Sequence, residues 1–335
     1  MLVTLPYKIL VEKNTKGKII STLESLHMGK ACTVVCSSNI QKIVSSHLNE
    51  ISSGVDTKIV EPAENVADIA KNVEGNFIIG IGGGKTIDIA KFLSHLSGKP
   101  WIAFPTILSH DGVVSSRAVL NEKGSKISVD AEEPSAIFAD LSIVRKAEYD
   151  YLAAGVGDLI SNFSAVEDWK IASKAGKEEY HEIMAKLSLV SAEAAALHVN
   201  EIKKKDYHGL EILFWSLVSA GFAMNIYGSS RPCSGSEHNI SHALDKLGST
   251  ALHGKQVALC TIVSMYMQKG DWKKIRRIMI EARLPVTAEA LGIEKEKMVE
   301  ALTIARNIRN RYTVLDKFKM TKPLAGRILK ATGII

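Results

Sequence analysis

The stretch IIGIGGGKTIDIAKF (residues 78–92) joins a run of apolar, β-branched residues to a helical pattern through three consecutive glycines. A glycine-rich turn between a strand and a helix suits a phosphate group, because bare backbone N–H groups at a helix N-terminus attract anions. Neither common nucleotide-binding motif fits. The P-loop pattern requires glycine where Ile79 stands, and the dinucleotide pattern G-x-G-x-x-G ends on Lys85. The stretch therefore predicts another kind of diphosphate loop, since a turn that only packs a helix on a strand does not need three glycines.

Apolar runs with strand character recur through the first part of the chain, and helical patterns separate them. The runs lie at residues 33–35, 57–62, 77–82, 101–106 and 136–141, and the helical patterns at 39–51, 62–73 and 86–96. Strands that alternate with helices predict a parallel sheet with right-handed crossovers. Residues 117–130 interrupt this alternation with two extended runs around Glu122-Lys123-Gly124, a pattern that predicts a β-hairpin.

The second part of the chain has a different character. Strand signals stop after about Arg145, and helical periodicity dominates from Leu152 onward, with long stretches at residues 177–205 and 208–226. A length of 335 residues is enough for about two domains. We expect a Rossmann-like α/β domain at residues 1–147 and an all-α domain at residues 148–335.

The charge pattern gives little support for nucleic-acid binding. The net charge is +6, and the local basic runs lie at residues 203–205 and 273–277. Both runs occur in helical patterns among acidic residues such as Asp206 and Glu281, so we expect solvated helix faces. A mild excess of positive charge also suits a small anionic substrate.

Four cysteines form no C-x-x-C pair and are too sparse for a disulfide framework, which favours reduced thiols in the cytoplasm. The N-terminal sequence MLVTLPYKILVEKN lacks the pattern of a signal peptide. The longest apolar run, VALCTIVSMYM at residues 257–267, is too short to span a bilayer. No membrane span is expected.

Three of the ten histidines lie close together in SGSEHNISHALDKLGSTALHGK, residues 234–255. Ser234 and Glu237 have the spacing of a capping box, which predicts a helix start and places His238 and His242 on one helical face. His253 follows at a predicted turn into another helix. Histidines at these spacings favour a metal or substrate site, but the spacing does not say which of them bind a metal.

A catalytic divalent metal is usually held by imidazole together with a carboxylate. Asp158, in AAGVGDLISNF, is a candidate carboxylate. It follows a pair of glycines at a predicted helix start, and by itself this position is more typical of an N-terminal capping aspartate.

The motifs GIGGGKTIDIAK (residues 80–91), PTILSHDG (105–112), GDLISN (157–162), SGSEHNISHAL (234–244) and His253-Gly254 together resemble the iron-containing alcohol dehydrogenase and glycerol dehydrogenase superfamily in order and spacing. Within it, SHDG with SGSEHNISHAL is similar to the sn-glycerol-1-phosphate dehydrogenases. The resemblance implies a dehydroquinate-synthase-like fold. It also implies a cytoplasmic homo-oligomer that uses NADPH or NADH and one metal ion per subunit, Zn²⁺ with Ni²⁺ or Fe²⁺ as alternatives.

The resemblance also implies roles for particular residues. The metal ligands correspond to Asp158, His238 and His253, and the catalytic residues to His242 and Asp111. Asp111, Asp158 and His242 correspond to substrate-facing positions. The cofactor-binding residues correspond to Gly84, Lys85, Thr86, Ile87, Asp88, Thr106, Ile107, Leu108, Ser109 and Ser115.

The implied reaction is reduction of dihydroxyacetone phosphate to sn-glycerol 1-phosphate for archaeal-type membrane phospholipids. Arg231, which lies beside the histidine helix in the sequence SSRPCSG, is either a phosphate partner or a surface residue. The strand end VVCSSN (residues 34–39) lacks the acidic residue that binds a free ribose 2′-hydroxyl, which admits NADPH beside NADH. Cys233 is either a passive small residue or a point of oxidation sensitivity. Alternatives are a glycerol or other polyol dehydrogenase, a dehydroquinate-synthase-like lyase, and a metal-independent nucleotide- or nucleic-acid-binding protein.

Overall fold

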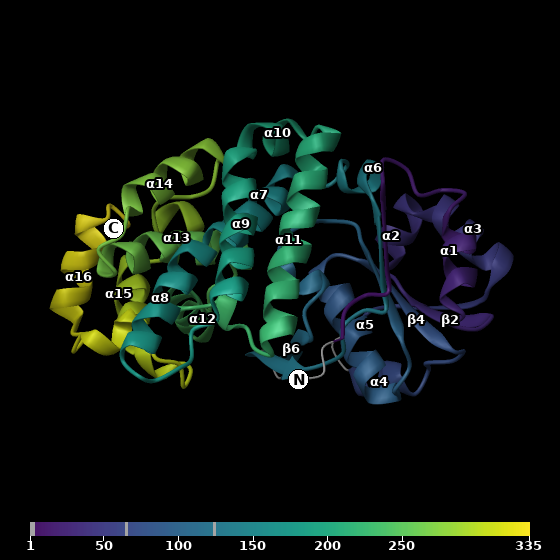
Figure 1. Cartoon of the computed structure of the whole chain (residues 1–335), viewed down its shortest axis with the longest axis horizontal. Coiled ribbons are helices and arrows are strands. Elements are labelled where there is room, and N and C mark those ends of the chain that lie inside the picture. The colour runs from purple at the N-terminus through teal and green to yellow at the C-terminus, as the bar shows by residue number, and fades with distance from the viewer. Residues whose placement is uncertain (1–3, 64–65, 123–124) are drawn as a thin grey trace. The chain divides into compact units, whose positions relative to one another are not determined.

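The computed structural model describes residues 4–63, 66–122 and 125–335. Its residues cluster into two compact units, Met1–Glu148 and Tyr149–Ile335. Each unit has a hydrophobic core of its own. The first unit combines a sheet with helices, and the second is built from helices (Figure 1).

A parallel sheet forms the centre of the first unit, with the strand order β1-β8-β5-β4-β2-β3. Its strands are β1 (Lys8–Glu12), β2 (Ala31–Val35), β3 (Asp56–Val60), β4 (Phe77–Gly82), β5 (Trp101–Pro105) and β8 (Ala136–Asp140). The predicted parallel sheet is confirmed, but β1 was not predicted. This five-residue edge strand pairs with β8, so that Lys8 stands opposite Ala136. It was passed over in the sequence analysis, although Ile9 and Val11 are residues typical of strands.

The helices of the first unit are α1 (Ile19–Leu26), α2 (Ser38–Ile43), α3 (Ser45–Gly54), α4 (Val66–Ala70), α5 (Gly84–Ser97) and α6 (Leu141–Val144). The side chains of Ile79 and Ile81 share a core with residues of α1 and α3. Gly80 between them faces α5, and a Cβ there would lie 2.6 Å from the Cβ of Ala90. The alternation of strand side chains and one missing Cβ therefore let α5 pack closely on β4.

An antiparallel hairpin separates β5 from β8, as the sequence predicted. Its strands are β6 (Arg117–Glu122) and β7 (Ser125–Asp130). The predicted turn residues Lys123 and Gly124 lie outside the described residues. The predicted helix at residues 62–73 also includes two positions outside them, and α4 covers a shorter segment, Val66–Ala70.

A buried carboxylate at the end of β8 ties three segments of the first unit together. Asp140 accepts hydrogen bonds from the backbone N–H of Thr15 at 2.7 Å and from His47 Nε2 at 3.0 Å. Its other oxygen caps α6 by accepting from the N–H groups of Ser142 and Ile143. Burial by itself would raise the pKa of Asp140, but the hydrogen bonds from His47, Ser142 and Thr15 lower it well below the usual range.

Replacing Asp140 by asparagine should lower the free energy of unfolding by roughly 2–4 kcal/mol at neutral pH, because it removes a buried charge on which several donors converge. The folded-state pKa is depressed, so this contribution is present above the unfolded value near 3.8 and is lost as the pH falls toward the folded-state pKa. Urea unfolding at pH 7 and pH 3 measures it. The gap between wild type and variant should shrink at pH 3, whereas the exposed Asp68→Asn should show no gap; an equal gap at both pH values would contradict the charge as the cause.

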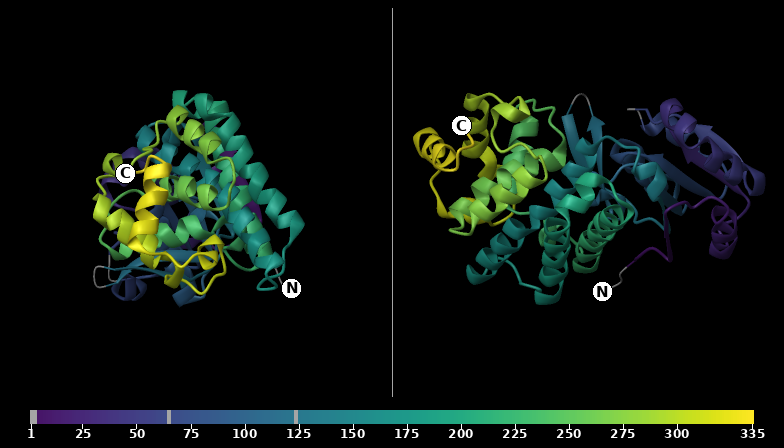
Figure 2. Two further views of the ribbon diagram at one scale, coloured as in Figure 1. Left: turned by 90° about the vertical axis from the view of Figure 1, so that its left-hand side faces the viewer. Right: turned by 90° about the horizontal axis from the view of Figure 1, so that it is seen from above.

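Every regular element from Tyr149 to Ile335 is a helix (Figure 2). The α-helices are α7 (Tyr149–Ile160), α8 (Asn162–Lys174), α9 (Glu182–Leu197), α10 (Val199–Lys204), α11 (Tyr207–Tyr227), α12 (Ser236–Lys246), α13 (His253–Met267), α14 (Trp272–Glu281), α15 (Lys295–Ile304) and α16 (Lys322–Ala331). Short 3-10 turns include η1 (Asp111–Val113) in the first unit and η2 (Arg231–Cys233), η3 (Glu289–Leu291), η4 (Ala305–Asn307) and η5 (Val314–Lys317) in the second. The predicted helix at residues 177–205 is divided at His198 into α9 and α10.

Helix α11 is the one described helix that has the length and apolarity of a membrane span. Its most apolar window has a mean hydropathy of 1.4, and 67% of that window is buried inside the protein. It packs along α9, as Figure 1 also shows. These properties are those of a core helix.

Candidate functional site

The glycine turn of the first unit lies where the strand order of the sheet reverses. The chain passes from β2 outward to β3 and then returns to β4 on the other side of β2. Ligands of open parallel sheets bind at the carboxyl ends of strands at such a point. The turn after β4 leads directly into α5, whose N-cap residue Gly83 provides no side-chain cap, so backbone N–H groups open this 14-residue helix.

Contacts with the ring of one histidine, His110, show why glycine occurs at position 84 in this turn and at position 112 in the SHDG segment. A Cβ at Gly84 would lie 2.4 Å from His110 Nε2, and a Cβ at Gly112 would lie 2.4 Å from His110 Nδ1. The ring of His110 accepts a hydrogen bond from the N–H of Gly112 at 2.9 Å. Burial lowers the pKa of His110, which keeps this acceptor neutral.

The second predicted cofactor segment, Thr106–Ser109, follows β5 and lies beside the glycine turn. The N–H of Thr106 donates to the carbonyl of Gly82 at 2.9 Å. The Oγ1 atom of Thr106 is buried and has no hydrogen-bond partner among the described residues. A buried hydroxyl of this kind fits contact with a ligand, because an unsatisfied polar atom costs free energy.

Lys91 holds the SHDG segment in place. Its buried ammonium donates to the carbonyl oxygens of Gly112 at 2.5 Å and Arg117 at 2.7 Å. Burial lowers the pKa of Lys91, and the neighbouring Asp88 opposes this shift. Burial also raises the pKa of Asp111 to about 6, against the opposing charge of Lys91. The motif TIDIAK therefore contributes a structural lysine that the sequence reading did not single out.

In the second unit, three predicted ligands meet at one point. Asp158, His238 and His253 each offer one ligand atom, and these atoms all lie within 4.8 Å of one another. Nε2 of His238 and Nε2 of His253 lie 3.9 Å and 3.8 Å from the same carboxylate oxygen of Asp158. One carboxylate and two imidazoles form a donor set that suits a divalent transition metal.

A close approach of two helix backbones places Asp158 beside His253. A Cβ at Gly157 in α7 would lie 2.4 Å from the carbonyl oxygen of Gly254 in α13, and a Cβ at Gly254 would lie 1.9 Å from the carbonyl oxygen of Ala154. Asp158 lies in the last turn of α7, near its C-terminal end. The interpretation of Asp158 as an N-terminal cap is therefore wrong, because the glycines before it serve helix packing and do not mark a helix start.

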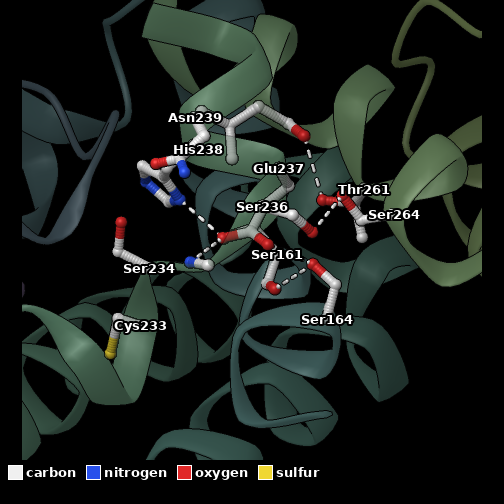
Figure 3. A network of polar contacts seen from close by, with 12 residues as sticks. Ser161, Ser164, Cys233, Ser234, Ser236, Glu237, His238, Asn239, Thr261 and Ser264 are labelled. Carbon is white, nitrogen blue, oxygen red and sulfur yellow. Dashed lines mark hydrogen bonds and ion pairs between the residues drawn. The ribbon is translucent and has the colours of Figure 1, made fainter. Parts of the chain in front are cut away.

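Glu237 holds His238 in a buried network of polar side chains (Figure 3). Its Oε1 lies 2.8 Å from His238 Nδ1 and also accepts from the N–H of Gly235, and its Oε2 accepts from Ser164 Oγ at 2.6 Å. With Nδ1 engaged, Nε2 faces Asp158. Burial raises the pKa of Glu237 and lowers the pKa of His238 well below its usual range, so the imidazole is neutral, as a metal ligand must be.

The predicted capping box is wrong. Helix α12 begins at Ser236 with Gly235 as its N-cap residue, and Ser234 does not cap it. Ser234 Oγ instead accepts from Arg309 Nη2 at 2.9 Å. The glutamate contacts the neighbouring histidine because Glu237 and His238 are both buried on the inner side of the helix.

His242 lies near the three-residue group without belonging to it. Its ring centre is 6.1 Å from the ring centres of both His238 and His253. Its Nδ1 lies 3.6 Å from Oδ2 of Asp245, and the side chain is partly exposed. The geometry therefore distinguishes His242 from His238, although the spacing in the sequence did not show which of the two histidines binds a metal.

Arg231, the predicted phosphate partner, is 0% exposed, and its buried Nη1 has no hydrogen-bond partner among the described residues. Its Nη2 donates to the carbonyl oxygens of Asp168 at 2.8 Å and Tyr312 at 3.0 Å. Its Nε lies 3.0 Å from Glu178 Oε2. Two other arginines, Arg309 and Arg311, lie beside Ser234. Both were missed in the sequence analysis because they are 75 and 77 residues from Ser234 along the chain.

Cys233 is also buried, at the end of η2. Its Sγ donates to the carbonyl oxygen of Ala220 at 3.4 Å and lies 3.5 Å from Ser188 Oγ. Its environment is that of a small core residue.

Known proteins share both halves of this architecture. Residues 10–147 match the family model described as "Iron-containing alcohol dehydrogenase". The chain is 39% identical to "Glycerol-1-phosphate dehydrogenase [NAD(P)+]" of Thermococcus kodakarensis, over 100% of this chain and 98% of the relative. The chain belongs to the glycerol-1-phosphate dehydrogenase branch of the iron-containing alcohol dehydrogenase family. A second member, from Methanosarcina barkeri, is 38% identical over 99% of this chain and 96% of its own length.

Solved structures agree with this family membership at the level of the fold. Glycerol dehydrogenase from Schizosaccharomyces pombe aligns with 99% of this chain and 90% of its own, with a TM-score of 0.79 at 20% identity. The iron-containing alcohol dehydrogenase fold, with its sheet unit followed by a helical unit, is therefore confirmed for this chain.

Proposed function

We propose that the chain catalyses the NAD(P)H-dependent reduction of dihydroxyacetone phosphate to sn-glycerol 1-phosphate, as a step toward archaeal-type membrane phospholipids. The observation that carries this proposal is the convergence of Asp158, His238 and His253 in a chain similar to glycerol-1-phosphate dehydrogenases over its whole length. The second candidate function is that of a polyol dehydrogenase, and only the shared fold supports it.

The three residues fit one divalent ion, and we propose Zn²⁺ with Ni²⁺ or Fe²⁺ as alternatives. Their donor atoms lie within 4.8 Å of one another, and His238 is neutral with its Nε2 directed to the group. A metal ion held there would polarise the ketone oxygen of the substrate, and a nicotinamide would supply the hydride. Glu237 keeps the His238 ring in one orientation by contacting Nδ1.

We propose that His242 donates the proton that converts the reduced ketone oxygen into the product alcohol. Its partly exposed ring can exchange a proton with solvent, and Asp245 lies 3.6 Å from its Nδ1. Asp158 would also border the substrate. For Asp111 in the first unit, whose pKa burial raises to about 6, we propose a second substrate-facing role.

For the cofactor, we propose that its pyrophosphate binds at the start of α5, between Gly84–Asp88 and Thr106–Ser109, with Ser115 nearby. The support is the helix N-terminus at the switch point of the sheet and the unpaired hydroxyl of Thr106. The strand β2 leads into Cys36-Ser37-Ser38-Asn39, which has no acidic residue of its own, while Glu61 after β3 accepts a hydrogen bond from Ser38 and leaves room for either cofactor in this proposal. Both NADPH and NADH should therefore be accepted.

Two further proposals concern the state of the protein in the cell. Four free, buried cysteines support a reducing, cytoplasmic location. A homo-oligomer is proposed from the family resemblance, and light scattering of the purified protein tests it.

The proposed function is tested by following NADPH and NADH oxidation with dihydroxyacetone phosphate and with plain dihydroxyacetone, and by identifying the enantiomer formed. The phosphorylated ketone should have the higher kcat/KM by at least about tenfold, because remote binding energy positions the carbonyl. The product should be sn-glycerol 1-phosphate. Equal rates with the two ketones would favour the polyol dehydrogenase instead.

His238→Ala and His242→Ala should have different effects, although both residues lie on α12. The first should lose bound metal, because its Nε2 belongs to the three-residue group. The second should keep stoichiometric metal and lose turnover, because its ring stands outside that group. Metal analysis of both purified variants measures the difference. Equal metal loss would instead support chelation by the histidine pair of one helical face.

A further inference from the structure

Two arginines donate to the segment that enters α12. Arg309 donates from Nε to Asn239 Oδ1 at 2.8 Å and from Nη2 to Ser234 Oγ at 2.9 Å. Arg311 donates from Nη1 to the carbonyl oxygen of Ser234 at 2.7 Å and from Nη2 to Ser230 Oγ at 3.1 Å. Both arginines are partly exposed, so solvent and small ions can reach their side chains.

Asn239 adds a buried donor to the same place. The residue is 0% exposed, and its Nδ2 has no hydrogen-bond partner among the described residues. The bond from Arg309 Nε fixes Oδ1 as the acceptor, so the orientation of the amide is set and Nδ2 is directed away from the guanidinium. A buried N–H that meets no protein acceptor is costly unless a ligand or water supplies one.

These three residues lie beside the proposed metal site. Asn239 directly follows His238 in α12. Arg309 Nε donates to the side chain of Asn239, so this guanidinium is bound to the residue that adjoins His238 in α12. Burial and the charge of the neighbouring Arg231 lower the pKa of Arg311 to about 10, against the opposing charges of Glu178 and Glu237.

We propose that Arg309, Arg311 and Nδ2 of Asn239 form the phosphate subsite for the substrate, replacing the buried Arg231 in that role. The inference rests on the proposed function, because it concerns the same site. In dihydroxyacetone phosphate, one methylene group and one ester oxygen separate the carbonyl carbon from phosphorus, so a phosphate held beside Asn239 keeps the ketone close to His238. Guanidinium groups and an amide N–H are suitable donors for a phosphate dianion.

The test compares Arg309→Gln, Arg311→Gln and Asn239→Asp with wild type. The measured quantity is the ratio of kcat/KM for dihydroxyacetone phosphate to kcat/KM for dihydroxyacetone in one preparation, which cancels any loss of folded or metal-loaded enzyme. Each arginine variant should lower this ratio about ten- to a hundredfold. Asn239→Asp keeps the acceptor for Arg309 but turns the donor into an anion, so it should lower the ratio at least as much. Inhibition by inorganic phosphate should weaken in parallel.

Arg306→Gln is the matched control, because Arg306 lies in the same segment, is exposed, and pairs with Asp316. Its ratio should equal that of wild type. If wild type prefers the phosphorylated ketone and all three variants keep its ratio within about twofold, the subsite is wrong while the proposed function stands. If wild type shows no preference for dihydroxyacetone phosphate over dihydroxyacetone, the result contradicts the proposed function itself.

Discussion

Purified Asp158→Asn should contain almost no bound metal and should have lost about a thousandfold or more of its kcat/KM. Asparagine has nearly the shape of aspartate but offers a neutral oxygen, and the charge of Asp158 faces both His238 and His253 at less than 4 Å. In a site of three protein ligands, losing the one anion removes several kcal/mol of ion binding and of charge stabilisation during the reaction. Metal content by mass spectrometry and steady-state kinetics measure the two effects separately.

Asp150→Asn is the appropriate control for that variant. Asp150 lies on the same helix, α7, but is exposed and forms an ion pair with Lys255. It should retain metal and nearly full activity. Stoichiometric metal in Asp158→Asn would show that Asp158 is not a ligand, whatever happens to turnover.

Gly254→Ala should lower the free energy of unfolding by roughly 2–4 kcal/mol and weaken metal binding at the same time. Alanine is favoured over glycine in a helix by about 1 kcal/mol, which alone would stabilise α13. The added Cβ, however, would lie 1.9 Å from the carbonyl oxygen of Ala154, and this atom belongs to the backbone of α7 and cannot rotate away. The two helices must separate, and Asp158 then moves away from His253.

Gly326→Ala tests the same reasoning with the opposite expected sign. Gly326 lies in α16, and nothing lies within 4 Å of a Cβ built there. This variant should be as stable as wild type or up to about 1 kcal/mol more stable. Thermal unfolding and metal titration of both variants provide the comparison. A Gly254→Ala protein with unchanged melting temperature and metal affinity would contradict the close backbone contact.

Periodicity in the sequence predicted most strands of the sheet and the all-helical second unit, because both depend on local patterns. It missed β1, whose place depends on pairing with β8 and not on its own five residues. It misread Asp158 as a cap and Glu237 as half of a capping box. In both cases the local motif was compatible with a helix start. The carboxylate of Asp158 instead faces His238 and His253, and Glu237 accepts from Ser164, contacts that form only when the helices pack.

The set Asp158, His238 and His253 was predicted from the family resemblance and not from the spacing of residues in the sequence. Spacing alone left His238, His242 and His253 equivalent, and the structure distinguishes them by the position of Asp158. Arg231 was chosen because it is near the histidines in sequence, but the charges that reach the solvent side of α12 come from Arg309 and Arg311. Proximity along the chain therefore did not show which arginines are accessible beside this helix.

The pairing of β1 with β8 also sets an order of events during synthesis of the chain. Strands β2 to β5 can associate as soon as each has left the ribosome, but β1 must wait for β8, and Asp140 meets Thr15 at a separation of 125 residues along the chain. Closing so long a loop costs entropy and slows folding. A nascent chain arrested between β5 and β8 would therefore expose the edge of β5, together with an unpaired β1, to chaperones or to other nascent chains.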